Sequence, residues 1–311
     1  MSTVRRVPPA QRLEVEIGDR RLSLSNLSKV LYPEAGFTKG QVIDYYTRIA
    51  PAVLPHLRGR PLTLKRYPNG VDQPYFYEKQ APSHRPDWVQ TAAVWSGHSS
   101  RTINYCLAND LPTLVWLANL ADLELHTSLS LAEDVKAPTL IAFDLDPGPP
   151  ATVVECAEVA LRLREAFDHL GLEAFPKTSG SKGMQVYVPL NTPTTYDDTK
   201  SFARALAQVL ERRHPKLVLS DMSKQRRTGK VFVDWSQNDE HKTTVNVYSL
   251  RARERPTVST PLSWDEVEDV SEPEELSFTS AEVLERVAEH GDLFAPVAEL
   301  QQELPVASSA S

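Results

Sequence analysis

The sequence has few cysteines and no long run of apolar residues. Only Cys106 and Cys156 occur among 311 residues, without the close spacing of metal ligands, so we interpret both as reduced, buried thiols. No apolar run approaches the length of a membrane span, and residues 1–6 lead into prolines and charges instead of the apolar core of a secretion signal. These absences favour a cytoplasmic protein that has no contact with a membrane.

Basic residues are almost absent from the last part of the chain. From Asp265 to the end, 13 acidic residues accompany one basic residue, Arg286, whereas the preceding part carries 33 basic and 28 acidic residues. The formal net charge of −7 therefore hides a positive body that can attract a polyanion, although charge runs are also common on ordinary solvated surfaces. We expect a catalytic domain over residues 1–264, an acidic helical segment over 265–304 packed on it, and a disordered tail over 305–311.

Capping patterns locate the helices. Thr38 and Gln41 form a capping box that begins one helix, and Thr152 with Glu155 begins another that ends at Gly171. Apolar periodicity predicts further helices over residues 111–121, 199–212 and 281–290. Short or alternating apolar runs predict strands at 13–17, 22–24, 62–67, 102–107 and 185–189. Because strands and helices are mixed along the chain, we expect an α+β or mixed α/β fold with one catalytic core.

Two aspartates interrupt an apolar strand in the middle of the chain. Residues 140–148 read Leu-Ile-Ala-Phe-Asp-Leu-Asp-Pro-Gly, and strand alternation puts Asp144 and Asp146 on one face. A third aspartate, Asp234, interrupts the apolar run at 231–235. A lone Asp-x-Asp is more often a turn cap at a strand end. Three carboxylates on apolar strands, however, are costly without a cation, which favours a site for Mg²⁺ or Mn²⁺.

A glycine-rich loop follows the aspartates. Residues 179–183, Ser-Gly-Ser-Lys-Gly, offer backbone amides, two hydroxyls and one ammonium, which suits phosphate binding as well as it suits an ordinary Ser/Gly loop. Beside metal-binding carboxylates, such a loop points to phosphoryl or nucleotidyl transfer. His126 and Arg251 are equally compatible with structural roles. Phe76 and Tyr77 could be core aromatics or exposed aromatics that stack on nucleobases.

Eight segments together resemble the polymerase domain of bacterial ligase D, a branch of the archaeo-eukaryotic primase superfamily. They are Asn-Leu-Ser-Lys-Val-Leu-Tyr-Pro (26–33), Leu-Lys-Arg-Tyr-Pro (64–68), Phe-Tyr-Glu-Lys (76–79), Ala-Pro-Ser-His-Arg-Pro-Asp-Trp-Val (81–89), Glu-Leu-His (124–126), Phe-Asp-Leu-Asp-Pro (143–147), Thr-Ser-Gly-Ser-Lys-Gly (178–183) and Lys-Val-Phe-Val-Asp-Trp-Ser-Gln-Asn (230–238). The resemblance implies an α+β primase-like catalytic core, with a central mixed or antiparallel sheet flanked by helices.

The resemblance also implies roles for individual residues. Two divalent ions, Mn²⁺ or Mg²⁺, would be held by Asp144, Asp146 and Asp234. The incoming nucleotide would be surrounded by His126, as a further catalytic group, and by Lys65, Ser179, Ser181, Lys182, Gly183, Gln185, Gln237 and Arg251. A DNA 5′-phosphate would be bound by Asn26, Lys29 and Lys39, and the template by Phe76, Tyr77, Lys79 and Arg227.

Two positions depart from the family pattern. Tyr77 replaces the second phenylalanine of the usual pair and keeps the capacity to stack on a base. Gln185 stands where the family usually has histidine, so a neutral amide replaces a ring that can carry charge. The cysteine count excludes the zinc module of cellular primases, and we interpret the chain as a stand-alone relative.

We expect a template-dependent primase-polymerase that fills short gaps or extends ends during DNA repair by non-homologous end joining. It would use a two-metal mechanism, prefer ribonucleotides, and act on gapped or broken double-stranded DNA with a 5′-phosphate and on rNTPs or dNTPs. A separate DNA ligase and end-binding proteins are further expected partners, and the nucleoid is the expected location.

Two alternative functions stay open at this point. A metal-dependent phosphatase would use Asp144 as its nucleophile, but Gly148 stands where such enzymes usually carry Thr or Val. A 5′-phosphate DNA-end-binding module with weak or lost catalysis would have no need of all three aspartates.

Overall fold

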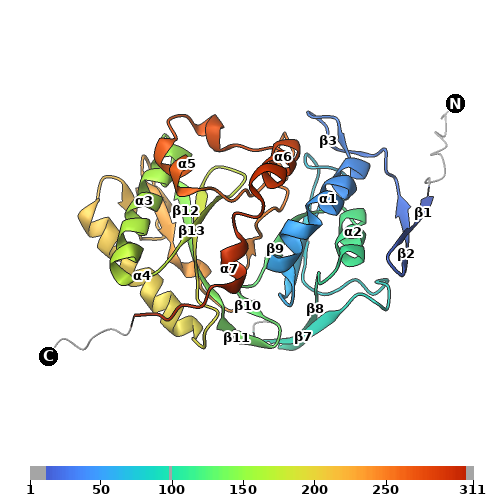
Figure 1. Ribbon diagram of the computed structural model, residues 1–311, viewed down its shortest axis with the longest axis horizontal. Coiled ribbons are helices and arrows are strands. Elements are labelled where there is room, and N and C mark those ends of the chain that lie inside the picture. Colours follow the sequence, from blue (N-terminus) through green and yellow to red (C-terminus); the bar gives the residue numbers. More distant parts are fainter. Residues whose placement is uncertain (1–11, 98–99, 306–311) are drawn as a thin grey trace.

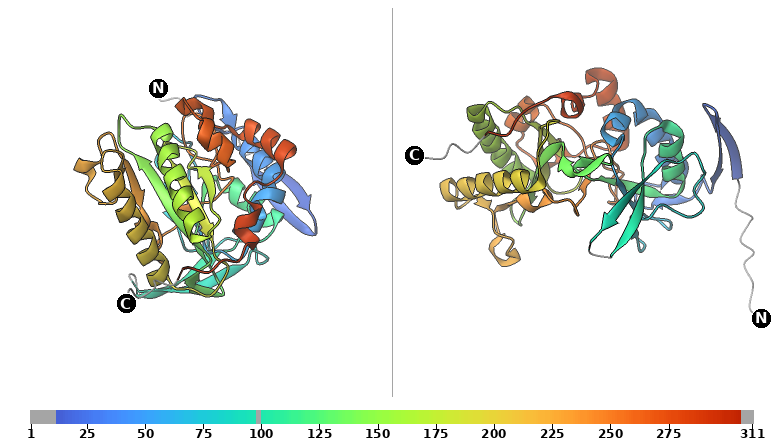
Figure 2. Two further views of the ribbon diagram at one scale, coloured as in Figure 1. Left: turned by 60° about the vertical axis from the view of Figure 1, so that its left-hand side comes forward. Right: turned by 90° about the horizontal axis from the view of Figure 1, so that it is seen from below.

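Two sheets lie side by side along the long axis and form the two lobes of the molecule (Figures 1 and 2). The structure, a computed structural model, describes residues 12–97 and 100–305, so the tail predicted from residue 305 lies almost entirely outside the described residues. The combination of mainly antiparallel sheets with separate helices confirms the α+β fold. Among the described residues, each helix is too short or too polar to cross a lipid bilayer.

The first lobe is built on a six-stranded antiparallel sheet with β5 near its centre. Its strands are β5 (Leu62–Arg66), β6 (Phe76–Glu78), β7 (Thr91–Ser96), β8 (Arg101–Cys106), β9 (Asp122–Thr127) and β17 (Thr244–Val245). The helices α1 (Lys39–Leu57) and α2 (Leu111–Asn119) belong to the same buried core as Leu64, Leu123 and Leu125. Strand alternation therefore turns Lys65 and Glu124 to the opposite face of this sheet.

The second lobe contains a five-stranded sheet with β12 in the middle. In spatial order its strands are β13 (Phe175–Thr178), β14 (Met184–Pro189), β12 (Leu140–Pro147), β16 (Val231–Asp234) and β15 (Val218–Leu219). The helices α3 (Val153–Leu170) and α4 (Tyr196–Arg213) share a core with Ile141, Phe143 and Leu145 of β12. The aspartates at 144 and 146 consequently lie on the face turned away from these helices.

The helix caps explain where three helices begin or end. Thr38 and Gln41 form the predicted capping box of α1, and Thr152 and Glu155 form that of α3. The helix α3 ends at Gly171, whose φ of 68° lies in the left-handed region. The helix α4 begins earlier than predicted because the Thr195 hydroxyl accepts a hydrogen bond from the Asp198 amide and caps Tyr196 as the first residue.

Three small hairpins complete the strands. They are β1 (Arg12–Ile17) with β2 (Arg20–Ser25), β3 (Val30–Tyr32) with β4 (Phe37–Thr38), and β10 (Ser130–Leu131) with β11 (Asp134–Pro138). The first of them lies at one end of the molecule, beside α2 (Figure 1), and confirms the hairpin predicted at 13–24.

The acidic C-terminal segment packs on both lobes. It contains α5 (Trp264–Asp269), α6 (Ser280–His290) and α7 (Ala295–Glu299); α5 contacts α3, while α6 and α7 contact α1. Within the segment, Arg286 pairs with Glu266 at 2.6 Å. Asp292 connects the segment to the rest of the chain, because it accepts a hydrogen bond from the Tyr248 hydroxyl at 2.6 Å and lies 2.8 Å from His56 Nε2. The segment thus bridges the two halves of the molecule, and its boundary at residue 264 stays a prediction.

Tyr46 provides a test of how the core is held together. Its buried hydroxyl donates to the Leu123 carbonyl at 2.7 Å and accepts from the Leu250 amide at 3.0 Å. Tyr46→Phe leaves both backbone groups without this partner, so we expect a loss of about 1–3 kcal/mol in the free energy of unfolding, measured by urea titration. Tyr105→Phe is the control, because the Tyr105 hydroxyl forms no hydrogen bond among the described residues; equal losses in both variants would contradict the assignment.

Candidate active site

A cleft of about 550 Å³ lies between the polar faces of the two sheets. The first lobe contributes Thr63, Tyr77 and His126, and the second contributes Asp144, Asp146 and Gln185. The remaining wall consists of the loop at 179–183 and of Lys79, Gln237, Arg251 and Arg253 among others. The cleft therefore brings together most of the side chains that the sequence predicts around a nucleotide, from segments far apart in the chain.

The carboxylates of the second lobe are placed by strand register. Asp144 of β12 pairs directly with Asp234 of β16 and with Gln185 of β14, and Asp146 follows two residues later. Directly paired residues of antiparallel strands point to the same face, so all three aspartates lie on the cleft side of the sheet. The Gln185 side-chain amide donates to Asp144 Oδ1 at 2.9 Å. Asp146 is half-exposed and lies 3.9 Å from an Arg227 nitrogen.

Burial and mutual repulsion raise the pKa values of two of the aspartates. Burial raises the pKa of Asp144, and the negative charge of Asp146 raises it further. Burial and the charge of Asp234 likewise raise the pKa of Asp146. A divalent cation between these groups would relieve the repulsion and keep them deprotonated.

The donor set fits a hard divalent cation in type and backbone position. Asp234 Oδ1 accepts hydrogen bonds from the Ser236 amide and hydroxyl, and Oδ2 accepts from Gln237 Nε2 at 3.0 Å. With the side chains turned this way, no three acidic, His or Cys side chains within residues 12–97 and 100–305 converge on one metal position. Gln237, predicted at the nucleotide, thus contacts Asp234 in this arrangement.

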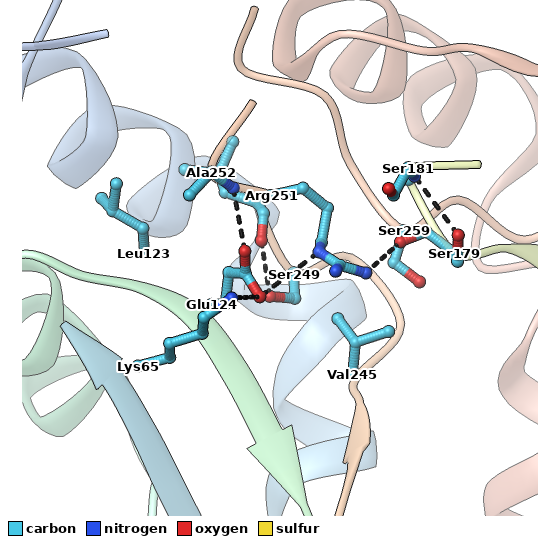
Figure 3. A network of polar contacts seen from close by, with 12 residues as sticks. Lys65, Leu123, Glu124, Ser179, Ser181, Val245, Ser249, Arg251, Ala252 and Ser259 are labelled. Atoms are coloured by element: carbon cyan, nitrogen blue, oxygen red, sulfur yellow. Dashed lines mark hydrogen bonds and ion pairs between the residues drawn. The ribbon is translucent and has the colours of Figure 1, made fainter. Parts of the chain in front are cut away.

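Across the cleft, one buried glutamate holds three basic side chains together. Glu124 Oε2 lies 3.1 Å from Lys65 Nζ, 3.0 Å from His126 Nε2 and 3.4 Å from Arg251 Nε. Its other oxygen accepts from the Ala252 amide at 3.0 Å. Figure 3 shows Glu124 between Lys65 and Arg251, with Arg251 extending toward the Ser179 loop.

The charges of this cluster shift one another's pKa values. Burial by itself would raise the pKa of Glu124, but the hydrogen bond from His126 and the positive charge of Arg251 lower it below its ordinary range. Burial lowers the pKa of His126, and Glu124 partly offsets that shift. Glu124 was not among the site residues predicted from the sequence. The signal was present, because a glutamate two residues before His126 on an apolar strand must share its face.

The loop at 179–183 lies against the aspartate strand. A Cβ atom on Gly183 would come within 2.1 Å of the Leu145 carbonyl oxygen, so only glycine allows this close approach. The Ser179 hydroxyl accepts from the amides of Ser181 and Gly183, and these two amides therefore stabilise the turn itself. Lys182 and the Ser181 hydroxyl line the cleft, and the latter contacts Arg253.

The residues predicted to bind a 5′-phosphate form a separate group. Lys29 Nζ donates to the Pro68 carbonyl at 2.5 Å, and Lys39 Nζ donates to the Ser25 carbonyl at 2.7 Å. Burial, followed by the positive charges of Lys29 and Arg66, lowers the pKa of Lys39 to about 8. Among the described residues no carboxylate pairs with either lysine. Asn26 adopts a φ of 55°, and its backbone carbonyl accepts a hydrogen bond from the Lys29 amide, which closes the turn between the two residues.

Three of the four predicted template residues, Phe76, Tyr77 and Lys79, are exposed beside the cleft, and Arg227 is partly buried. Phe76 and Tyr77 of β6 are 42% and 56% exposed, which rules out the interpretation as core aromatics. The Arg66 guanidinium lies over the Phe76 ring at 5.1 Å, and the Tyr77 ring meets His126 edge-on at 6.0 Å. Arg227 follows η1 (Lys224–Arg226) and covers the Phe232 ring at 3.9 Å, next to Asp146. Both rims of the cleft therefore present flat or cationic groups.

Known proteins are similar to this chain in sequence. The family model described as "LigD, primase-polymerase domain" matches residues 38–294. The chain is 45% identical over 289 residues to the multifunctional non-homologous end joining protein LigD of Mycolicibacterium smegmatis, covering 92% of this chain and 37% of that protein. It is 31% identical to the bifunctional LigD of Bacillus subtilis, covering 87% and 43% respectively. The chain thus spans less than half the length of these relatives.

A solved structure matches as well. The polymerase domain of Mycobacterium tuberculosis ligase D, in complex with DNA, superimposes with a TM-score of 0.84 at 41% sequence identity, covering 91% of this chain and 99% of that one. Family model, sequence identity and superposition agree over the same part of the chain. The chain therefore belongs to the family of LigD primase-polymerase domains, which are metal-dependent, DNA-directed nucleotidyltransferases.

Proposed function

We propose that this chain adds nucleotides to a 3′-hydroxyl at gaps and ends of broken double-stranded DNA, as a polymerase of non-homologous end joining. The observation that carries the proposal is the cleft of about 550 Å³, in which Asp144 and Asp146, with Asp234 on the same sheet face, lie opposite His126 and Arg251. A nucleotidyl transferase needs this pairing, because negative charge must be neutralised at the triphosphate while carboxylates supply a metal site.

Asp144, Asp146 and Asp234 would hold two divalent ions, Mn²⁺ or Mg²⁺. Their hard carboxylate oxygens, their common sheet face and the raised pKa values of Asp144 and Asp146 support this assignment. When bound there, the ions would supply the charge that activates the 3′-hydroxyl and stabilises the leaving pyrophosphate. Gln185 and Gln237 would keep the carboxylates of Asp144 and Asp234 oriented by their hydrogen bonds.

The facing cluster would bind the triphosphate. Arg251, His126 and Lys182 line the cleft, while Lys65 lies behind them against Glu124. Because Glu124 fixes the cations before substrate arrives, little side-chain entropy would be lost on binding. We further propose that ribonucleotides are preferred over deoxyribonucleotides, as the family resemblance implies.

DNA would lie across the exposed rim of the cleft. Phe76 and Tyr77 would stack on template bases, with Lys79 and Arg227 near the backbone, and Asn26, Lys29 and Lys39 would receive the 5′-phosphate across a gap. A separate ligase would then seal the product, and end-binding proteins would bring the chain to breaks in the nucleoid.

The first prediction concerns the carboxylates. Asp144→Asn removes one charge from the proposed metal site, so primer extension on a gapped duplex with Mn²⁺ should fall at least about a hundredfold while DNA binding is kept. Asp168→Asn, on the exposed surface of α3, is the matched control and should extend normally. Extension by Asp144→Asn at the wild-type rate would refute the metal site. Absence of extension by the wild type itself, with DNA binding intact, would favour a DNA-end-binding module.

The second prediction concerns Glu124. Glu124→Gln weakens charge-assisted hydrogen bonds worth about 1.5–3 kcal/mol each, so the nucleotide KM should rise about tenfold or more. Because the Glu124 charge raises the pKa of His126, its loss should shift protonation of His126 to lower pH, which NMR titration of the imidazole can follow. Glu266→Gln, which weakens the pair with Arg286, should change neither quantity. An unchanged KM would show that the cluster does not bind the nucleotide.

The third prediction concerns the 5′-phosphate. In the Lys29→Ala/Lys39→Ala variant, binding to a gapped duplex should weaken more than about tenfold, and the preference for a 5′-phosphate over a 5′-hydroxyl should disappear. Since the pKa of Lys39 is lowered to about 8, the wild-type preference should itself decline as pH rises through 8 and the ammonium loses its charge. Fluorescence anisotropy with both duplexes measures this, and rising salt should also reduce the preference. A variant that keeps the preference would place the pocket elsewhere.

A further inference from the structure

A buried lysine stands at the end of the row of side chains that leads to the aspartates. Lys177 of β13 pairs with Gln185 of β14, Gln185 pairs with Asp144 of β12, and Asp144 pairs with Asp234 of β16. Because each pair is directly opposite on adjacent antiparallel strands, the four side chains lie in one line on the cleft face of the sheet. Lys177 is fully buried, whereas Asp144 borders the cleft.

The Lys177 ammonium is surrounded by hydrogen-bond acceptors. Nζ lies 2.6 Å from Gln185 Oε1, 2.6 Å from Ser259 Oγ and 3.1 Å from the Val245 carbonyl oxygen. The Ser259 hydroxyl gives its own hydrogen to the Thr178 carbonyl at 2.8 Å, so it accepts from Lys177. An ammonium has three N–H donors and no acceptor, and here each donor has a partner. Burial lowers the pKa of Lys177, and the nearby Asp144 charge opposes that shift.

These contacts decide which way the Gln185 amide points. Since Lys177 can only donate, the Gln185 oxygen must face it, and Nε2 is then directed at Asp144 Oδ1, 2.9 Å away. The Tyr187 hydroxyl is 3.4 Å from the same Gln185 oxygen but donates at 2.9 Å to Thr244, so its influence is weaker. With the amide reversed, two oxygens would face each other and Asp144 would lose its donor.

We propose that Lys177 is a positioning residue of the active site, which acts through Gln185 to hold the Asp144 carboxylate in the orientation that binds a divalent cation. The inference rests on the metal site of the proposed function. Gln185, in place of the histidine usual in the family, would thus act on Asp144 and not on the triphosphate.

Direct binding of Mn²⁺ tests the proposal without relying on turnover. Electron paramagnetic resonance measures the concentration of free Mn²⁺ while the whole chain is titrated with Mn²⁺ in the absence of DNA and nucleotide. Lys177→Met should weaken Mn²⁺ binding about ten- to a hundredfold, as loss of an outer partner of a metal ligand does. Gln185→Leu should weaken it to a similar extent.

The double variant separates a relay from a general loss of order. If Lys177 acts through Gln185, then Lys177→Met/Gln185→Leu should bind Mn²⁺ no more weakly than Gln185→Leu alone. Fully additive losses would overturn the relay. If Lys177→Met is unfolded at the assay temperature, Ser259→Ala removes one of the three acceptors and keeps the charge. It should weaken Mn²⁺ binding severalfold in the wild-type background and not in the Gln185→Leu background; wild-type affinity would overturn the proposal.

Arg60→Met is the matched control, because it also replaces a buried basic side chain with methionine. The Arg60 guanidinium is also buried, donates to the Leu129 carbonyl at 2.9 Å and to the Thr139 hydroxyl at 2.8 Å, and within the described part of the chain bonds to no aspartate of the site. It should lose thermal stability and keep wild-type Mn²⁺ affinity. Wild-type protein that binds no Mn²⁺ would refute the metal site itself, whereas binding by wild type and Lys177→Met alike would refute only this inference.

Discussion

Antiparallel pairing of β12 with β14 on one side and β16 on the other is the constraint on which the site depends. It places Asp144 between Gln185 and Asp234, and the two-residue repeat of β12 adds Asp146 to the same face. A slip of one residue would turn the carboxylates into the core of α3 and α4 and bring Phe143 or Leu145 to the cleft. The apolar residues that pack on those helices therefore secure the register, and the catalytic face follows from the packing of the opposite face.

The two walls of the cleft carry charges of opposite sign. On one sheet, three carboxylates lie on the same face, and bound divalent cations would neutralise their charge. On the other sheet, Lys65, His126 and Arg251 share the buried Glu124. A buried charge is tolerated only when it is paired and hydrogen-bonded, and Glu124 meets that condition through four neighbouring groups. A polyanionic substrate with bound cations would complement both walls at once.

Local chemistry was predictable from the sequence, and long-range pairing was not. The capping boxes at Thr38 and Thr152 and the glycine at 171 fixed helix ends because their hydrogen bonds lie within a few residues. The face shared by Asp144 and Asp146 follows from strand alternation alone. The pairing of Asp144 with Gln185 and with Asp234, by contrast, joins residues far apart in the chain and depends on which strand lies next to which. Glu124 was not predicted because its ion pairs are with Lys65 on a neighbouring strand and Arg251 in a distant loop, and only the fold brings these residues together.

The acidic C-terminal segment has a mechanical consequence for the cleft. Asp292 contacts both His56 of α1 and Tyr248, and Gln302 bonds to the backbone of Pro189 and Leu190 beside β14, so the segment is fastened to each lobe. These contacts oppose an opening of the two lobes relative to each other. The packed C-terminal segment thus helps to hold the carboxylate wall and the cation wall at one separation, and a triphosphate bound as proposed would have to match that spacing.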